Sequence, residues 1–174
     1  MKIAPRSIVL IGFMGTGKSS VARELARRQG WPHFDTDEMV TEALEMPVAE
    51  IFARLGEERF RTEESAILTK LDPALRSVIA AGGGTILRPQ NVKRLRQLGT
   101  TVCLTADLPT LLHRLADRSD RPLLPTENRA AKIEALLRER EPLYEQAADL
   151  IIDTSSLTPD EIIEAIRKSL GLAG

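Results

Sequence analysis

The sequence predicts an α/β fold, in which a five-stranded parallel sheet carries helices on both faces. Two observations lead to this prediction. Short runs rich in valine and isoleucine recur along the chain, and amphipathic helical patterns separate them. Strands that alternate with helices pair in parallel through crossover connections, which place helices on both sides of the sheet. No linker or repeat divides the 174 residues, so we expect a single domain over 1–174.

Five apolar runs are expected to form the strands, because their hydrophobicity is continuous rather than alternating. In chain order they are residues 7–11, 31–34, 76–80, 100–104 and 149–153.

Helical spacing of apolar residues predicts the intervening helices. The spaced residues lie within 21–26, 60–71, 95–98, 111–115, 133–137 and 162–170. The last helix is the clearest, because residues 158–161 read T-P-D-E, a capping-box pattern, and Gly171 follows its end. We expect the helix that carries Arg140 to be broken by Pro142.

Composition excludes several classes of protein. The chain has 24 basic and 25 acidic residues, a balance that argues against a general nucleic-acid coat. The single Cys103 rules out an intramolecular disulfide and a cysteine-based zinc site. The clearest apolar stretch, residues 8–14, is too short to span a bilayer. We therefore expect a cytoplasmic protein that binds neither nucleic acid nor membrane. Separately from composition, we expect a monomer.

The strongest motif is G-F-M-G-T-G-K-S at residues 12–19, which fits the phosphate-binding pattern G-x-x-x-x-G-K-[ST]. It follows an expected strand and opens an expected helix, so its backbone N–H groups and the helix N-terminus can face an anion. In such a loop Lys18 reaches the β- and γ-phosphates and Ser19 ligates Mg²⁺. One alternative is a glycine-rich turn before a helix. Another, the dinucleotide fingerprint, requires the reverse glycine spacing.

Two carboxylates, Asp35 and Asp37, follow the second expected strand. Because the carboxyl ends of parallel strands face the ligand crevice, one could lie near Mg²⁺ and the other near a phosphate-accepting hydroxyl. The alternative is a capped start for the next helix. Asp107 is a second candidate for the metal, but it equally well begins the following helix, and we prefer Asp35.

Glycines at 82–84 follow the third expected strand and could let a ligand lie against the backbone, or could form a flexible turn. Three arginines are also ambiguous from spacing alone. Arg61 could lie on a solvated, salt-bridged helix face. Arg121 lies in 118–126, a polar segment with two prolines that could close over transferring phosphates. Arg140 could pair with a substrate carboxylate.

Taken together, six motifs resemble those of the shikimate kinase family over nearly the whole chain. They are the phosphate loop 12–20, D-T-D at 35–37, G-E-E-R-F-R at 56–61, the triple glycine 82–84, R-P-L-L at 121–124 and R-E-P-L-Y at 140–144. The resemblance implies a P-loop fold like that of nucleoside monophosphate kinases. It also implies a shikimate-binding region at about 35–62 and a mobile lid at about 114–129.

The resemblance further implies transfer of the ATP γ-phosphate to the 3-hydroxyl of shikimate, with one Mg²⁺ per subunit. Asp37 would bind the shikimate hydroxyls, and Lys18 and Arg121 would stabilise the phosphates. Ser19 would hold Mg²⁺ directly and Asp35 through water. The implied nucleotide-binding residues are Gly15, Thr16, Gly17, Lys18, Ser19, Ser20, Arg121 and Arg114, the last stacking on adenine. The implied shikimate-binding residues are Asp37, Arg61, Gly82, Gly83, Gly84 and Arg140, with both arginines on the carboxylate.

Two other functions remain open at this point. Another P-loop small-molecule kinase, such as a gluconate kinase, shares the loop but gives no reason for two carboxylate-binding arginines beside D-T-D. A non-catalytic ATP-binding module would not need Asp37.

Overall fold

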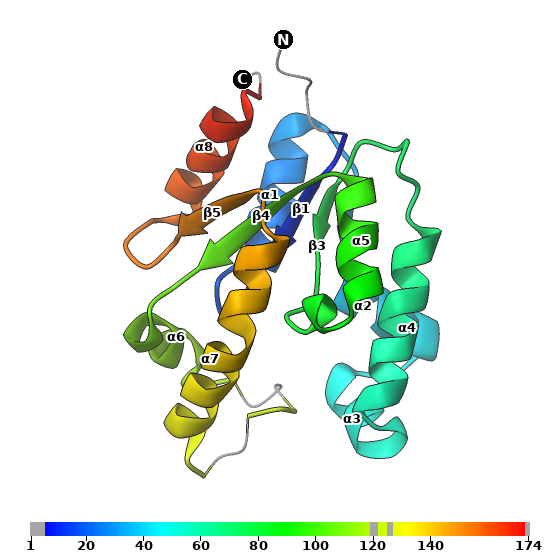
Figure 1. Cartoon of the computed structure of the whole chain (residues 1–174), viewed down its shortest axis with the longest axis vertical. Coiled ribbons are helices and arrows are strands. Elements are labelled where there is room, and N and C mark those ends of the chain that lie inside the picture. Colours follow the sequence, from blue (N-terminus) through cyan, green and yellow to red (C-terminus); the bar gives the residue numbers. More distant parts are fainter. Residues whose placement is uncertain (1–5, 119–121, 125–126, 173–174) are drawn as a thin grey trace.

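The structure is a computed structural model that describes residues 6–118, 122–124 and 127–172. Within those ranges five parallel strands form one sheet, as predicted, in the order β2-β3-β1-β4-β5. The strands are β1 (Ile8–Ile11), β2 (His33–Asp35), β3 (Val78–Ala80), β4 (Thr100–Thr105) and β5 (Leu150–Asp153). The central position of β1 places the phosphate loop that follows it in the middle of the sheet edge (Figure 1).

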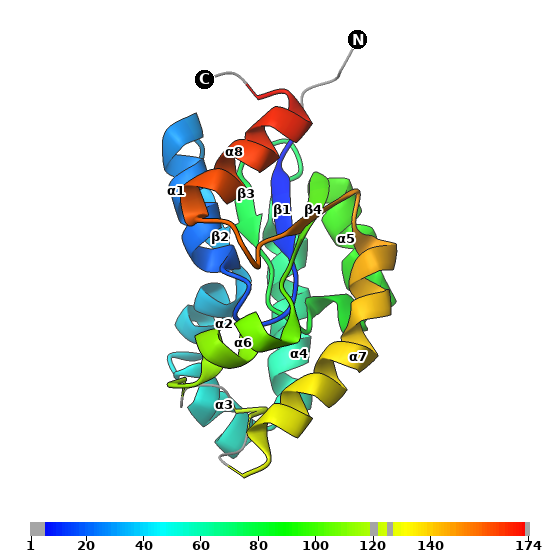
Figure 2. The ribbon, with the colours of Figure 1, turned by 90° about the vertical axis from the view of Figure 1, so that its left-hand side faces the viewer.

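Helices cover both faces of this sheet, as predicted (Figure 2). On one face lie α1 (Lys18–Gln29) and α8 (Pro159–Leu170). On the other lie α4 (Glu57–Lys70), α5 (Pro89–Leu98) and α7 (Arg129–Ala147). Ile8 and Leu10 of β1 pack against the first group, whereas Val9 and Ile11 pack against the second. Both faces of the strand are buried, which explains why its sequence is apolar without alternation.

The remaining elements lie beyond the carboxyl ends of the strands. They are α2 (Thr36–Leu44), α3 (Val48–Leu55), α6 (Leu108–Leu115) and the short 3₁₀ helix η1 (Thr85–Leu87). A small apolar cluster holds α2 and α3 onto α4 through Val40, Ile51, Phe60 and Ile67. This arrangement places α2 and α4 beside the phosphate loop.

Several expected strand boundaries were wrong by one or two residues. The second and third strands each begin two residues later than predicted, at His33 and Val78. Pro32 contributes only its carbonyl to the ladder, accepting from the Val78 N–H, because proline has no N–H to donate. The helix that follows β2 begins at Thr36, directly after Asp35 and within the D-T-D motif.

The expected break at Pro142 was also wrong, because α7 continues to Ala147. Proline in a helix interior removes one backbone hydrogen bond. Beyond it, however, Tyr144 and Ala147 are buried in the core at 3% and 2% exposure. Burial of these side chains offsets the lost hydrogen bond, so the helix runs through the proline.

None of the helices in the described part of the chain is both long enough and apolar enough to cross a membrane.

Candidate active site

The phosphate loop joins β1 to α1 and has the geometry of an anion site. Gly17 occupies the N-cap of α1 in the left-handed conformation, at φ 90°, and no side chain caps the helix there. The first-turn N–H groups of α1 therefore remain available to an anion. Lys18 Nζ donates to the Phe13 carbonyl oxygen of the loop at 2.9 Å. The Thr16 side chain is buried and also donates to that oxygen, at 2.8 Å, so it serves the loop's own shape.

A pocket opens over this loop, lined by Gly15, Gly17, Lys18, Ser19, Ser20, Arg114 and Arg118. Of the residues expected to bind nucleotide, the described ones thus gather in one place, except that Thr16 turns its side chain into the loop. Arg121 lies outside the described residues.

Ser19 and Asp35 meet at the carboxyl end of β2. The Ser19 hydroxyl donates to Asp35 Oδ2 at 2.6 Å. Asp35 Oδ1 accepts from the backbone N–H groups of Asp37 and Glu38 at 3.0 and 3.3 Å, which caps α2. Asp35 therefore both caps the helix and lies beside the phosphate loop. Asp107, the other candidate, caps α6 by accepting from the Thr110 N–H at 2.8 Å.

The Ser19–Asp35 pair fits Mg²⁺ by its donor chemistry, because both side chains offer oxygen. Among the described residues no group of three or more His, Cys, Asp or Glu side chains could hold a metal ion. Mg²⁺ beside a nucleotide typically takes only one or two protein oxygens in addition to phosphate oxygens and water. A pair of oxygen ligands next to the phosphate loop matches that pattern.

The triple glycine is where the predicted substrate residues converge. A Cβ atom on Gly82 would lie 2.5 Å from both Asp37 Oδ1 and Glu64 Oε1, and one on Gly84 would overlap the Arg61 guanidinium. A Cβ on Gly83 would be 3.6 Å from Arg140 Nη1 and 3.6 Å from the backbone nitrogen of Met14 in the phosphate loop. The absence of side chains at 82–84 lets these groups approach one another.

Both arginines are buried, which rules out the solvated-face alternative for Arg61. Arg61 is 7% exposed and pairs with Glu64 at 3.2 Å and Glu57 at 3.3 Å. Arg140 is 3% exposed, and no carboxylate in the described part of the chain forms an ion pair with it. Its buried Nε also has no hydrogen-bond partner, and neither has that of Arg61. A buried cation needs a counter-charge, and Arg140 has none among the described residues, so an anionic ligand suits the position of Arg140 beside Arg61.

Glu64 is a site residue that the sequence patterns did not reveal. Its side chain is fully buried and accepts hydrogen bonds from Arg61 and from the Thr85 hydroxyl. Burial raises the pKa of the Glu64 carboxyl, while the neighbouring Arg61 opposes that shift. The sequence did offer one sign of this role, because helical spacing places Glu64 on the same side of its helix as Phe60 and Ile67. An acidic residue on a buried side of a helix needs a partner.

Tyr144, the last residue of the R-E-P-L-Y motif, also takes part in the site. Its hydroxyl donates to the Gly83 carbonyl oxygen and so ties α7 to the triple glycine. Burial raises the pKa of Tyr144 to about 12, so the phenol stays protonated and can donate.

Arg114 links the phosphate loop to the segment after β5. Its guanidinium donates to the Gly15 carbonyl oxygen at 3.2 Å, and to the hydroxyl and carbonyl oxygens of Thr154 at 3.0 and 3.1 Å. Arg114, which the resemblance places on adenine, is thus in contact with both the phosphate loop and Thr154, the residue that follows β5.

The expected lid is described only in part, because residues 119–121 and 125–126 lie outside the described ranges. Arg129 donates to the carbonyl oxygens of Leu115 and Arg118, so α7 is bonded to the chain just before that gap. Pro122 contributes to two adjoining pockets, one beside Ser19 and Asp35 and the other between Arg61 and Arg140; Asp37 lines both. A ligand in these pockets could therefore reach from the Ser19–Asp35 pair to the two arginines.

Comparison with known proteins agrees with this geometry. Residues 14–171 match the family model described as shikimate kinase. The chain is 46% identical to a shikimate kinase of Thermodesulfovibrio yellowstonii over 163 residues, 94% of each chain. A solved shikimate kinase of Acinetobacter baumannii in complex with shikimate superposes with a TM-score of 0.90 at 33% identity, covering 98% of this chain and 95% of that one.

A gluconokinase of Sinorhizobium meliloti, at 18% identity and a TM-score of 0.57, shares the fold alone. From the family match and the full-length similarity to curated relatives, this chain belongs to the shikimate kinase family, with the P-loop fold of the nucleoside monophosphate kinases.

Proposed function

We propose that this enzyme transfers the γ-phosphate of ATP to the 3-hydroxyl of shikimate, a step in the synthesis of aromatic amino acids. Family membership supports the activity. The observation that carries the assignment to this site is the convergence of Asp37, Arg61 and Arg140 on the triple glycine, beside the phosphate loop. That convergence brings groups for a carboxylate, a hydroxyl and a triphosphate into one crevice.

The two arginines would hold the shikimate carboxylate. Their burial favours a charge-assisted pair with a ligand anion, and Glu64 fixes the direction of the Arg61 guanidinium. Tyr144 would hold Gly83 in place, so that the backbone at 82–84 can lie against the substrate ring. The acceptor is thereby fixed in orientation before transfer.

Asp37 would accept a hydrogen bond from the shikimate hydroxyl that receives the phosphoryl group. It comes two residues after Asp35 and lines both pockets, the one beside Ser19 and Asp35 and the one between Arg61 and Arg140. In the reaction the bond between the γ-phosphorus and its bridging oxygen breaks, a bond to the shikimate oxygen forms, and the hydroxyl proton is released. Phosphoryl transfer of this kind depends on positioning and charge neutralisation more than on covalent catalysis.

Lys18, the N-terminus of α1 and Arg121 would neutralise the phosphates. The first two are supported by the loop geometry. The role of Arg121 rests on its position in the R-P-L-L motif, and the segment 114–129 would close over the nucleotide. Ser19 and Asp35 would hold Mg²⁺, which would neutralise phosphate charge when bound. Arg114 would lie against adenine. We further propose a cytoplasmic monomer with one Mg²⁺.

The test is a product assay on the purified chain with ATP and Mg²⁺. Shikimate should produce ADP and a phosphorylated shikimate in equal amounts, identified by mass spectrometry. Gluconate in place of shikimate should produce neither. Phosphorylation of gluconate would assign a different acceptor, and ATP binding without phosphorylation of either acid would indicate a non-catalytic module.

A further inference from the structure

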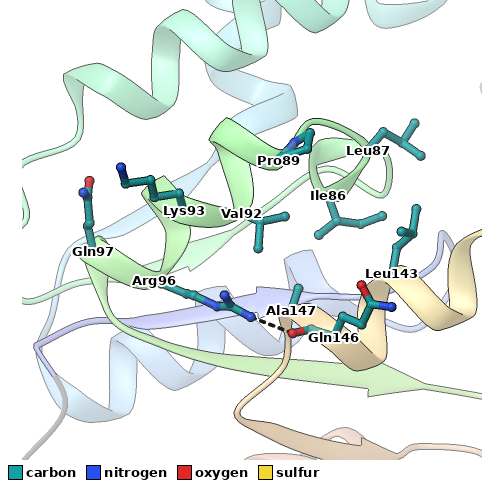
Figure 3. Close-up of a pocket in the computed structure, with 10 residues that line it drawn as sticks. All are labelled: Ile86, Leu87, Pro89, Val92, Lys93, Arg96, Gln97, Leu143, Gln146 and Ala147. Atoms are coloured by element: carbon teal, nitrogen blue, oxygen red, sulfur yellow. Dashed lines mark hydrogen bonds between the residues drawn. The ribbon is translucent and has the colours of Figure 1, made fainter.

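One groove is lined by residues that are distant in the sequence from the phosphate loop and that have no part in the proposed reaction. It lies between α5 and α7, under η1, and has a volume of about 550 Å³ (Figure 3). Clefts of about 300–1,000 Å³ are the usual size for small-molecule sites. Ile86 and Val92 on one wall face Leu143 and Ala147 on the other (Figure 3).

The charged residues of the groove all carry the same sign. Lys93 and Arg96 of α5 lie at its rim, and no acidic residue is among the described residues that line it. Arg96 donates to the Gln146 carbonyl oxygen at 2.6 Å, and neither cation forms an ion pair with a carboxylate in the described ranges. A guanidinium has five N–H donors, so Arg96 keeps donors for a ligand. The groove thus combines an apolar floor with uncompensated positive charge.

We propose that this groove binds a small amphipathic carboxylate, and that its occupancy is linked to shikimate binding. The apolar body of the ligand lies between Val92 and Leu143, and its carboxylate binds Arg96. Lys93 is exposed on a flexible stem and reaches the same carboxylate by a change of rotamer.

The linkage follows from shared walls. The η1 wall begins directly after Gly84, and Asn91 of α5 donates to the Thr85 carbonyl oxygen at 3.1 Å. The α7 wall includes Leu143, whose neighbour Tyr144 donates to Gly83. Packed interiors transmit displacements because they contain few voids. A ligand that changes the distance between α5 and α7 therefore also shifts η1 and α7, the two elements that hold the triple glycine in place.

Calorimetric titration with 3-phenylpropionate tests the binding, with ADP saturating the nucleotide site and shikimate saturating the pocket between Arg61 and Arg140. The uncharged 3-phenylpropionamide serves as the matched probe without the carboxylate. We expect one site per chain, with the amide binding about fivefold or more weakly, as for loss of a charge-assisted contact. Arg96→Gln should weaken binding of the carboxylate to a similar degree, and Val92→Trp should abolish it by filling the groove. Arg138→Gln, an exposed arginine of α7 outside the groove, should leave binding unchanged.

Equal affinity for the acid and the amide, no binding of the acid, or full binding to a folded Val92→Trp protein would each overturn the proposal. If Val92→Trp does not fold by circular dichroism, the surface variant Lys93→Gln/Arg96→Gln decides. Sedimentation velocity gives one more outcome: a dimer that Val92→Trp dissociates would make the occupant a second copy of this chain and overturn the small-ligand assignment.

The linkage half rests on the proposed function, whereas the binding half does not. Linkage requires that the probe change the Kd of shikimate by the same factor by which shikimate changes the Kd of the probe. A factor of one in both directions would refute linkage. Failure of shikimate to bind in the absence of the probe would instead count against the proposed function, so the two failures are distinguishable.

Discussion

Lys18 is the residue on which phosphoryl transfer should depend most directly. It is partly exposed at the mouth of the phosphate loop, so its removal opens no cavity in the core. We expect Lys18→Ala to lower kcat about a hundredfold or more, in the range found on removing one group that stabilises transition-state charge. Steady-state kinetics measure the loss, and far-ultraviolet circular dichroism should match the wild type. Lys70→Ala, at an exposed helix end, is the matched control.

The buried residues Arg61 and Arg140 should both contribute to shikimate affinity, but only Arg61 should also contribute to the stability of the fold. Arg140→Ala should weaken shikimate binding by about 2–5 kcal/mol and leave ATP binding nearly unchanged, because a buried charge-assisted contact is lost. Arg61→Ala should weaken shikimate binding similarly but also destabilise the fold, since it leaves Glu64 buried without its cation.

Titration of each variant with shikimate and with an ATP analogue checks this difference, alongside urea unfolding. Equal losses of affinity for both ligands would contradict a carboxylate-specific role for these arginines.

Tyr144 should give a pH signature in the alkaline range. Its pKa is raised to about 12 in the folded protein, against about 10 for an unperturbed tyrosine. Between these values the folded protein binds more protons than the unfolded chain. The stability that Tyr144 contributes is therefore complete below about pH 10 and is lost as pH rises toward 12. We expect Tyr144→Phe to show a smaller decline in unfolding free energy over that window, by up to about 2 kcal/mol, and a raised KM for shikimate near neutral pH. An unchanged KM for shikimate in Tyr144→Phe would contradict the proposal that Tyr144 positions the triple glycine.

At the scale of elements, one side chain from α5 holds the end of α4. The guanidinium of Arg94 donates to the carbonyl oxygens of Leu68 at 3.0 Å and Leu71 at 2.5 Å, and also to Thr69. The last carbonyls of a helix have no partner within the helix, and α4 ends without a left-handed cap residue. This contact joins the helix that carries Arg61 to the wall of the α5–α7 groove.

We expect Arg94→Ala to lower the free energy of unfolding by about 1–3 kcal/mol, because part-buried carbonyls lose their donor. Arg54→Ala, which removes an exposed i,i+4 pair with Glu50, should cost only about 0.3–0.5 kcal/mol. Urea denaturation measures both. Equal effects of the two substitutions would mean that the α4 end is satisfied by water.

At the scale of the whole molecule, ligands should stabilise the fold, since the proposed shikimate pocket joins α3, α4, α7 and the phosphate loop. Shikimate at a hundred times its Kd should raise the free energy of unfolding by about 2.7 kcal/mol. At the same shikimate concentration, the increase in the free energy of unfolding should nearly vanish in the Arg140→Ala variant. Thermal unfolding followed by calorimetry gives the comparison, with gluconate as the ligand expected to have no effect.

The sequence by itself determined the architecture and most of the chemistry. Continuous apolar runs arise because both faces of each inner strand are buried, so hydrophobicity alone locates the strands. The phosphate loop could be predicted because its glycines and lysine are close together in the chain, whereas the activity was implied by the resemblance of six motifs to the shikimate kinase family. Asp35 could be predicted to lie near the phosphate loop because it comes at the end of a strand. In the structure it caps α2 and accepts a hydrogen bond from Ser19.

Only the tertiary structure decided which ambiguous residues meet. Arg61 and Arg140 are 79 positions apart in the sequence, and only packing of α4 and α7 against the same glycines brings them together. Spacing placed Glu64 on the apolar side of its helix but could not show which cation it meets there, and the structure shows that this partner is Arg61. Pro142 shows the same limit, because local propensity predicts a break, whereas burial of the residues beyond it keeps the helix intact. Local patterns specify elements, but burial and pairing depend on neighbours that are distant in the chain, which the linear sequence does not display.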